Sequence, residues 1–236
     1  VTTANYLTAI GYSSLAANTT GSQNTGLGIQ TLLNNTSGDY NTAVGINSLH
    51  SNTTASNNTS VGQNSMFLSV SGDNNTAVGN ATLDANTTAS ANTTLGYASL
   101  GANTTGPNNA AFGYNALALN TTAAYNTAVG YNTLASNTDG TQNVAVGGLA
   151  LDANTTGTSN TAVGYSSLGA NTTGANNTAM GVLALNGCVT GTQNSAFGRS
   201  SLTLNTGDYN TAVGYDTIGE AGDGSYNTAV GRTSAN

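Results

Sequence analysis

Apolar and polar residues follow one another along the chain with a fixed period of 17 residues. A glycine that closes the motif N-T-A-V-G recurs at this interval from Gly11 to Gly231, and only the step from Gly198 to Gly214 is shorter, at 16 residues. Such a period is typical of repeat architectures in which one structural unit stacks on the next. The sequence therefore predicts about fourteen copies of one coil, with regular repeats in residues 1–214 and an irregular terminal repeat, or transition, in residues 215–236.

Two columns of large apolar residues recur along the chain, one just before this glycine and one four residues after it. Large apolar residues at fixed positions of a repeat are the natural core of a stacked fold. Both columns are therefore predicted to be buried, and their representative members are Val44, Leu49, Val78, Leu83, Val129, Leu134, Val163 and Leu168.

Each unit is predicted to contain short strands and no helix. It carries β-branched threonine and valine, glycine and several asparagines, all of which are poor helix formers. The segment N-T-A-V-G-Y is predicted as one strand, in which the small alanine faces away from the valine, and L-x-x-N-T-T as a second. The expected fold is all-β: a parallel β-solenoid, or β-roll, of about fourteen 17-residue coils.

An asparagine four residues before the glycine is the most regular polar feature of the repeat, because only Leu7 interrupts it. Stacked coils would align these amides, and a ladder of hydrogen bonds would satisfy polar groups at a buried turn. The predicted structural ladder contains Asn24, Asn41, Asn58, Asn75, Asn92, Asn109, Asn126, Asn143, Asn160, Asn177, Asn194, Asn210 and Asn227.

The composition excludes several classes of partner. Charged residues make up only 5% of the chain and apolar residues 37%, which favours an ordered repeat over a disordered segment. The net charge of −7 arises from nine acids against two arginines, without lysine, so there is no electrostatic basis for binding nucleic acid or an anionic membrane. No apolar run approaches the length of a membrane span.

Chemically reactive residues are too few for catalysis. The chain has one histidine, His50, and one cysteine, Cys188, so neither a Ser/His/Asp nor a Cys/His arrangement is expected. His50 is interpreted as a solvated variant position, and Cys188 as a small apolar substitution where other units have asparagine. The sequence predicts no enzyme, no catalytic residue, no cofactor and no metal.

Other polar and aromatic positions have structural interpretations. Asp39, Asp73 and Asp208 share a turn after glycine, which favours turn chemistry over calcium, and Asp84 and Asp152 are expected to keep the surface soluble. The N-T-T triplets match the glycosylation sequon, but such matches are inevitable in a chain rich in asparagine and threonine. Tyrosines recur just after the glycine, where stacking or subunit packing is favoured over glycan binding; they are Tyr12, Tyr97, Tyr114, Tyr131, Tyr165 and Tyr215.

Units such as NTAVGYNTLASNTDGTQ (126–142) and NTAVGYSSLGANTTGAN (160–176) closely resemble the repeats of phage tail-fibre-like proteins and bacterial "tail fiber domain" proteins. They are more loosely similar to the NSVAIG head repeats of trimeric autotransporter adhesins, whose unit is usually shorter. The resemblance covers essentially the whole chain. It implies a left-handed parallel β-roll that associates as a homotrimer, consistent with a coil that offers few large side chains for a core of its own.

These features predict a structural protein: the shaft of a trimeric fibre, in a phage tail fibre or a cell-surface adhesin, that spaces a receptor-binding element from its base. Its location would be the virion, the cell surface or the extracellular space. Its partners would be further copies of itself, with end-to-end fibre or base-protein contacts. The alternatives are a self-assembling extracellular filament and a repeat surface that binds glycan or ice. The acidic segment with Asp216, Glu220 and Asp223 is predicted to bulge outward as a transition.

Overall fold

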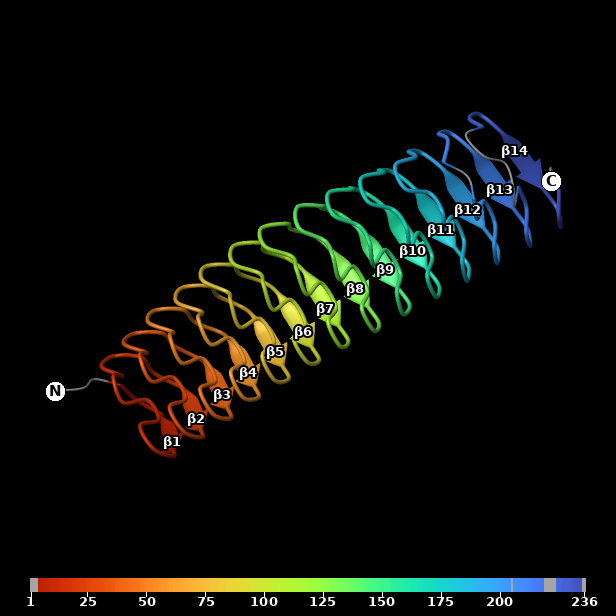
Figure 1. Ribbon diagram of the computed structural model, residues 1–236. Helices are drawn as coiled ribbons and strands as arrows, with labels where there is room; N and C mark the ends of the chain where they lie inside the picture. The colour runs from red at the N-terminus through yellow and green to blue at the C-terminus, as the bar shows by residue number, and fades with distance from the viewer. Residues whose placement is uncertain (1–3, 205, 219–223, 235–236) are drawn as a thin grey trace. The chain divides into compact units, whose positions relative to one another are not determined.

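The computed structural model describes residues 4–204, 206–218 and 224–234. These residues contain strands and turns but no helix, and they form a parallel β-solenoid with one strand in each of about fourteen coils. The chain divides into two compact units, unit 1 (Val1–Thr122) and unit 2 (Ala123–Asn236). Within each unit, successive coils lie side by side (Figure 1).

Every strand is three residues long and ends just before the repeat glycine. The strands of unit 1 are β1 (Thr8–Ile10), β2 (Thr25–Leu27), β3 (Thr42–Val44), β4 (Thr59–Val61), β5 (Thr76–Val78), β6 (Thr93–Leu95) and β7 (Ala110–Phe112). The strands of unit 2 are β8 (Thr127–Val129), β9 (Val144–Val146), β10 (Thr161–Val163), β11 (Thr178–Met180), β12 (Ser195–Phe197), β13 (Thr211–Val213) and β14 (Thr228–Val230).

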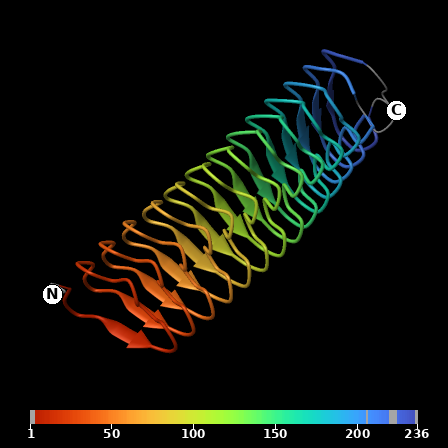
Figure 2. The same ribbon diagram turned by 60° about the vertical axis from the view of Figure 1, so that its left-hand side comes forward.

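Within each unit the strands pair in parallel and in chain order, so equivalent residues of successive repeats lie side by side. Figure 2 shows the strands in a row along one side of the coils, with loops closing the other sides. The shortened repeat keeps this register, because Ser195 pairs with Thr211 and Phe197 with Val213. The repeat is therefore one residue shorter in a loop and not in a strand, so the pairing of the strands is unaffected.

The predicted second strand, L-x-x-N-T-T, is absent from the described residues. Each coil instead turns at residues with positive φ, as at Asn47 (56°), Leu49 (50°) and Asn57 (62°). A left-handed conformation costs a non-glycine residue about 1–2 kcal/mol, and asparagine tolerates it better than most. Leucine in this conformation is unexpected from sequence, but burying its side chain contributes about 1.5–3 kcal/mol and offsets the strain.

The leucine column lies inside the coils, and the valine column lies outside. Leu49, Leu83, Leu134 and Leu168 are fully buried. Contrary to the core prediction, Val129 is 36% exposed. The other three predicted core valines, all half-buried, are Val44, Val78 and Val163.

Alanine, not valine, faces the interior from the strand. Ala43 and Ala128 are fully buried between their threonine and valine neighbours. Alternate residues of a strand point to opposite faces, so burying the alanine turns the residues on either side of it outward. The coil is narrow and already holds one leucine, which leaves room for a methyl group opposite but not for a second large side chain.

Candidate functional site

The predicted asparagine column is buried in the described coils and is hydrogen-bonded to the backbone. Asn41 Nδ2 donates to the carbonyl of Ala55 in its own coil (2.8 Å), and the backbone N–H of Asn41 donates to Oδ1 of Asn24 (2.9 Å). Asn143 repeats the pattern, donating to the Gly157 carbonyl and accepting from the N–H of Asn160. In most of the described coils the column therefore closes the coil and joins it to the next, mainly through side-chain to backbone bonds; Asn58 only joins its neighbour, because its Nδ2 is buried without a partner. Asn227, in the last coil, is the exposed member.

A second asparagine column, seven residues after the glycine, forms a true ladder of side-chain amides. Asn35 Nδ2 donates to Oδ1 of Asn18 (2.6 Å), and Asn171 Nδ2 donates to Oδ1 of Asn154 (2.9 Å). Sequence reasoning missed this ladder, although the fixed phase of the N-T-T triplet was the signal that would have revealed it. The buried members of the column are Asn18, Asn35, Asn52, Asn86, Asn103, Asn120, Asn137, Asn154 and Asn171.

Because these asparagines are buried, the N-T-T sequons are inaccessible in the folded chain. The amide nitrogen that would carry a glycan instead donates within the coil, as Asn154 Nδ2 does to the Gly157 carbonyl (3.1 Å). A sugar on this nitrogen would remove the bond and could not fit in the interior. The N-T-T triplets are thus structural features of the coil.

Ser69 and Cys188 interrupt the second column, and each leaves a neighbouring amide oxygen without a partner. Neither replaces the amide donor, so Oδ1 of Asn52 and Oδ1 of Asn171 are buried and unpaired. Cys188 is itself buried, and burial raises the pKa of its thiol to about 11. Since the thiolate is the reactive form, the Cys188 side chain is suited to packing rather than to nucleophilic chemistry.

Aspartates near the coil turns also join neighbouring coils. The carboxylate of Asp39 accepts a hydrogen bond from the backbone N–H of Ser22 (2.6 Å), and the N–H of Asp39 donates to Oγ of Ser56 (3.0 Å). In the same way, the carboxylate of Asp73 accepts from the N–H of Ser56, and that of Asp208 accepts from the N–H of Thr192, each in the preceding coil. Serine and aspartate thus alternate in unit 1, which keeps carboxylates two coils apart and reduces their repulsion.

We expect Asp39→Ala to lower the free energy of unfolding by about 1 kcal/mol, because the Ser22 N–H loses its acceptor. Asp39→Asn is the matched control, since its side-chain oxygen can still accept this bond. Urea denaturation followed by circular dichroism measures both variants. Equal losses in the two variants would show that the carboxylate charge, and not the hydrogen bond, stabilises the coil.

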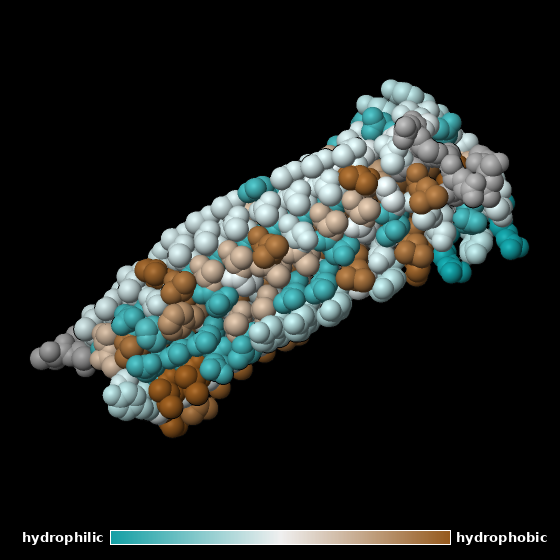
Figure 3. All heavy atoms as spheres, in the orientation of Figure 1, coloured by the Kyte–Doolittle hydropathy of each residue, from teal (hydrophilic) through white to brown (hydrophobic). Residues whose placement is uncertain are grey.

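The outward-facing residues of the strands form a continuous uncharged surface in each unit. We call this surface the strand face and define it as the first and third residues of β1–β7 in unit 1 and of β8–β14 in unit 2. Its apolar side chains include Leu95 in unit 1 (50% exposed) and Met180 in unit 2 (43% exposed). Figure 3 shows brown, apolar atoms over β1 and β2. Threonine fills most of the first strand positions, so a row of hydroxyl groups runs beside the apolar row.

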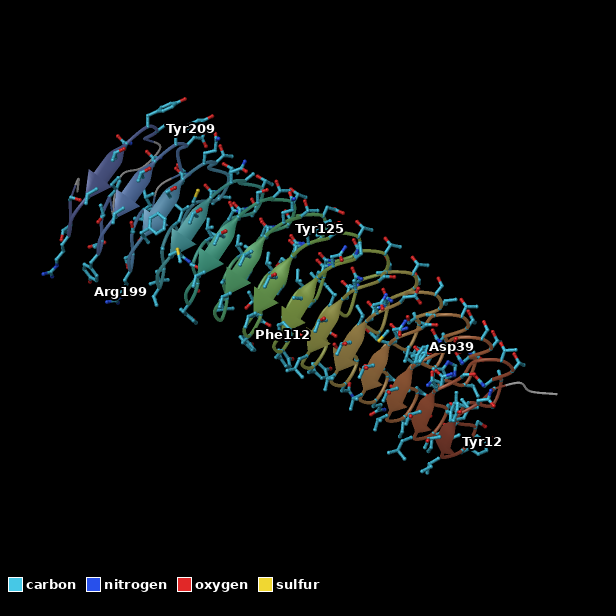
Figure 4. The ribbon with its side chains drawn as sticks, turned by 180° about the vertical axis from the view of Figure 1, so that it is seen from behind. Tyr12, Asp39, Phe112, Tyr125, Arg199 and Tyr209 are labelled. Atoms are coloured by element: carbon cyan, nitrogen blue, oxygen red, sulfur yellow. The ribbon has the colours of Figure 1, made fainter. Side chains whose placement is uncertain are left out.

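The residue just after each glycine forms a neighbouring column, which we call the rim column. In unit 1 the rings of Tyr97 and Tyr114 stack at 5.3 Å between centroids. In unit 2 the column carries Arg199, Tyr215 and Arg232. Figure 4 shows Arg199 at the edge of unit 2 opposite Tyr125 and Tyr209. Aromatic stacking follows directly from the parallel register, which places equivalent rings one coil apart.

His50, Asp84 and Asp152 are three further titratable residues of the described coils. His50 packs against the ring of Phe67 at 4.9 Å between centroids, and burial lowers the pKa of its imidazole. Asp84 and Asp152 are half-buried, and desolvation raises the pKa of each carboxyl although nearby backbone N–H groups oppose the change. Within the described ranges, no three His, Cys, Asp or Glu residues gather as a metal site would require.

The last predicted segment is described only in part. Asp216 lies in the left-handed region (φ 51°), and its N–H donates to the carbonyl of Arg199 in the preceding coil. Glu220 and Asp223, which were predicted to bulge outward with it, lie outside the described residues. The part of the chain that the structure describes also contains no helix long and apolar enough to cross a membrane.

In comparisons with known proteins, no protein-family model, no curated protein and no solved structure matches the chain. The strand face is an extended apolar surface that the described coils leave open in each unit, and on the strength of its geometry we take it as the candidate functional site.

Proposed function

We propose that the chain is the shaft of a homotrimeric fibre, and that three copies pack through their strand faces. The observation that carries this proposal is the outward-facing apolar row, which has no covering element within its own unit. Soluble monomers rarely expose contiguous apolar surface of this kind, and such patches mark association sites. Packing three rows together would supply the apolar core that a narrow coil with one buried leucine lacks.

The distribution of charge supports self-association through this face. Each copy carries a net charge of −7, so identical chains repel one another unless their acids are kept apart. The described aspartates belong to other positions of the coil, as Asp39, Asp84 and Asp152 do. The strand face itself carries no charged residue.

A fibre shaft is also the role that best suits the regularity of the repeat. Coils joined by backbone and amide ladders resist bending and keep a constant cross-section, as a spacer requires. The likeness of the repeats to those of phage tail fibres and trimeric adhesins points the same way. The shaft would hold a receptor-binding element away from its base on a virion or at a cell surface.

The mass of the assembly tests this proposal. Sedimentation equilibrium of the chain should give three times the 23.2 kDa of one copy. Val163→Asp, which places a carboxylate on the strand face, should give monomers that retain the β-rich circular dichroism spectrum. Thr173→Asp is the control, because Thr173 is exposed at the position that Asp139 occupies two coils earlier; it should remain trimeric. A wild-type monomer would overturn the trimer, and a mass that grows with concentration would favour a filament.

Ice binding is the second candidate, because the structure places threonine and valine in two parallel rows on one face. Threonine fills the first strand position of most coils and faces outward there, so these residues form a single row on this face. Their spacing is that of parallel strands, about 4.8 Å. Thermal hysteresis by a monomeric wild-type chain, abolished by Val163→Asp, would favour this function over the shaft.

A further inference from the structure

The only two arginines of the chain, which has no lysine, lie in one column of unit 2, two coils apart. Arg199 and Arg232 both belong to the rim column, and Tyr215 lies between them. The guanidinium carbon of Arg199 is 5.7 Å from the centre of the Tyr215 ring, and that of Arg232 is 5.6 Å from it. All three side chains are exposed.

We propose that Arg199, Tyr215 and Arg232 form a binding site for an acidic polysaccharide. A guanidinium group that contacts a ring through its face keeps its N–H donors directed outward, where they can form paired hydrogen bonds with a carboxylate. The Tyr215 ring holds both arginines, so less side-chain freedom is lost when a ligand binds. This inference is independent of the proposed shaft, since it concerns the rim column and not the strand face.

The spacing of the arginines indicates the kind of anion. Two coils separate their backbones by about 9.6 Å, because each coil advances by one strand spacing of about 4.8 Å. Two guanidinium groups held on one ring from coils at this spacing can each pair with a different carboxylate. A chain of sugars in which separate residues carry carboxylates can contact both, and the hydroxyls of Ser200 and Thr233 lie in the same coils as the arginines to meet sugar hydroxyls.

The charge of the whole chain distinguishes this ligand from nucleic acid. A DNA duplex presents a negative charge about every 1.7 Å along its axis, and single strands are also densely charged. Such a ligand would place unpaired phosphates against a protein with a net charge of −7. A polysaccharide with widely spaced carboxylates matches two isolated arginines better.

Calorimetric titration with a hexasaccharide in which a uronic acid alternates with a neutral sugar tests the proposal, with its methyl ester as the neutral probe. The acidic hexamer should bind, with an affinity that falls as salt is added, and the ester should not. Arg199→Gln and Arg232→Gln should each weaken binding about tenfold or more, since each removes a charge-assisted hydrogen bond. Tyr215→Ala should also weaken binding, whereas Tyr215→Phe, which keeps the ring, should bind as the wild type does.

Tyr165→Ala is the control in the same column, and it should leave the affinity unchanged. Equal binding of the ester, or unchanged binding by the double arginine variant, would overturn the proposal, as would equal or tighter binding of a single-stranded DNA hexamer. Sedimentation of each variant separates this site from assembly: a changed mass in the arginine variants would show that the arginines serve contacts between copies instead. An unchanged mass with lost binding is the expected result.

Discussion

Gly147→Ala should lower the free energy of unfolding by about 3–5 kcal/mol, because backbone strain and a close contact between coils both oppose the added methyl group. Gly147 has a φ of 127°, in a region that is open almost only to glycine. A Cβ there would lie 2.6 Å from the carbonyl oxygen of Gly164 in the next coil. That atom belongs to the backbone and cannot move without separating the coils, so strain and steric overlap add.

The adjacent residue provides a matched control. Gly148 has no positive φ, and a Cβ there would meet the ring of Tyr165 at an ordinary 3.7 Å. Gly148→Ala should therefore leave the stability unchanged or raise it slightly, because alanine restricts the unfolded chain more than glycine does. Urea denaturation at one fixed protein concentration compares the two variants. Equal midpoints would contradict the close stacking of the glycine column.

Asn143→Leu should lower the free energy of unfolding by about 2–4 kcal/mol, although leucine has the same branching and the same number of side-chain heavy atoms as asparagine. The substitution leaves the Asn160 N–H without its acceptor inside the coil. It also removes the shorter of the two bonds to the Gly157 carbonyl, which keeps only Asn154 Nδ2 as a donor. Each unsatisfied buried group costs about 1–3 kcal/mol. Asn80→Leu, at an exposed position of the rim column, should change the stability by less than about 0.5 kcal/mol.

Asn143→Asp keeps the volume of the side chain, so its effect on stability reports on hydrogen bonding and not on size. The stability of this variant should depend on pH. The introduced carboxyl can accept from the Asn160 N–H in either form, but it can donate to the Gly157 carbonyl only when protonated. Burial and this bond both favour the neutral form, so the pKa of the carboxyl rises on folding. Stability should be close to that of the wild type below the ordinary pKa of aspartate, about 3.9, and should fall as the pH rises. If the difference in unfolding free energy between this variant and the wild type did not change with pH, the hydrogen bond to the Gly157 carbonyl would be contradicted.

Much of the fold follows from the sequence because its period is so regular. A parallel stack in register places equivalent residues in contact, so any position that keeps its chemistry through the repeat must form a column. This argument placed the leucines, including Leu49 and Leu134, in the interior and grouped the asparagines before the strands. It also predicted an all-β solenoid, since the repeat lacks any helical pattern.

Tertiary structure decided which side of each strand faces inward and how each coil turns. Alternation along T-A-V is compatible with either face, and only the narrow interior, filled by leucine, selects Ala43 over Val44. The positive φ of Leu49 likewise depends on the burial that offsets its strain. The sequence by itself therefore determined the period, the columns and the stacking, because these need only like residues to meet. The outward strand face and the arginine pair on Tyr215 came from packing, because side-chain direction depends on how much volume the interior can hold.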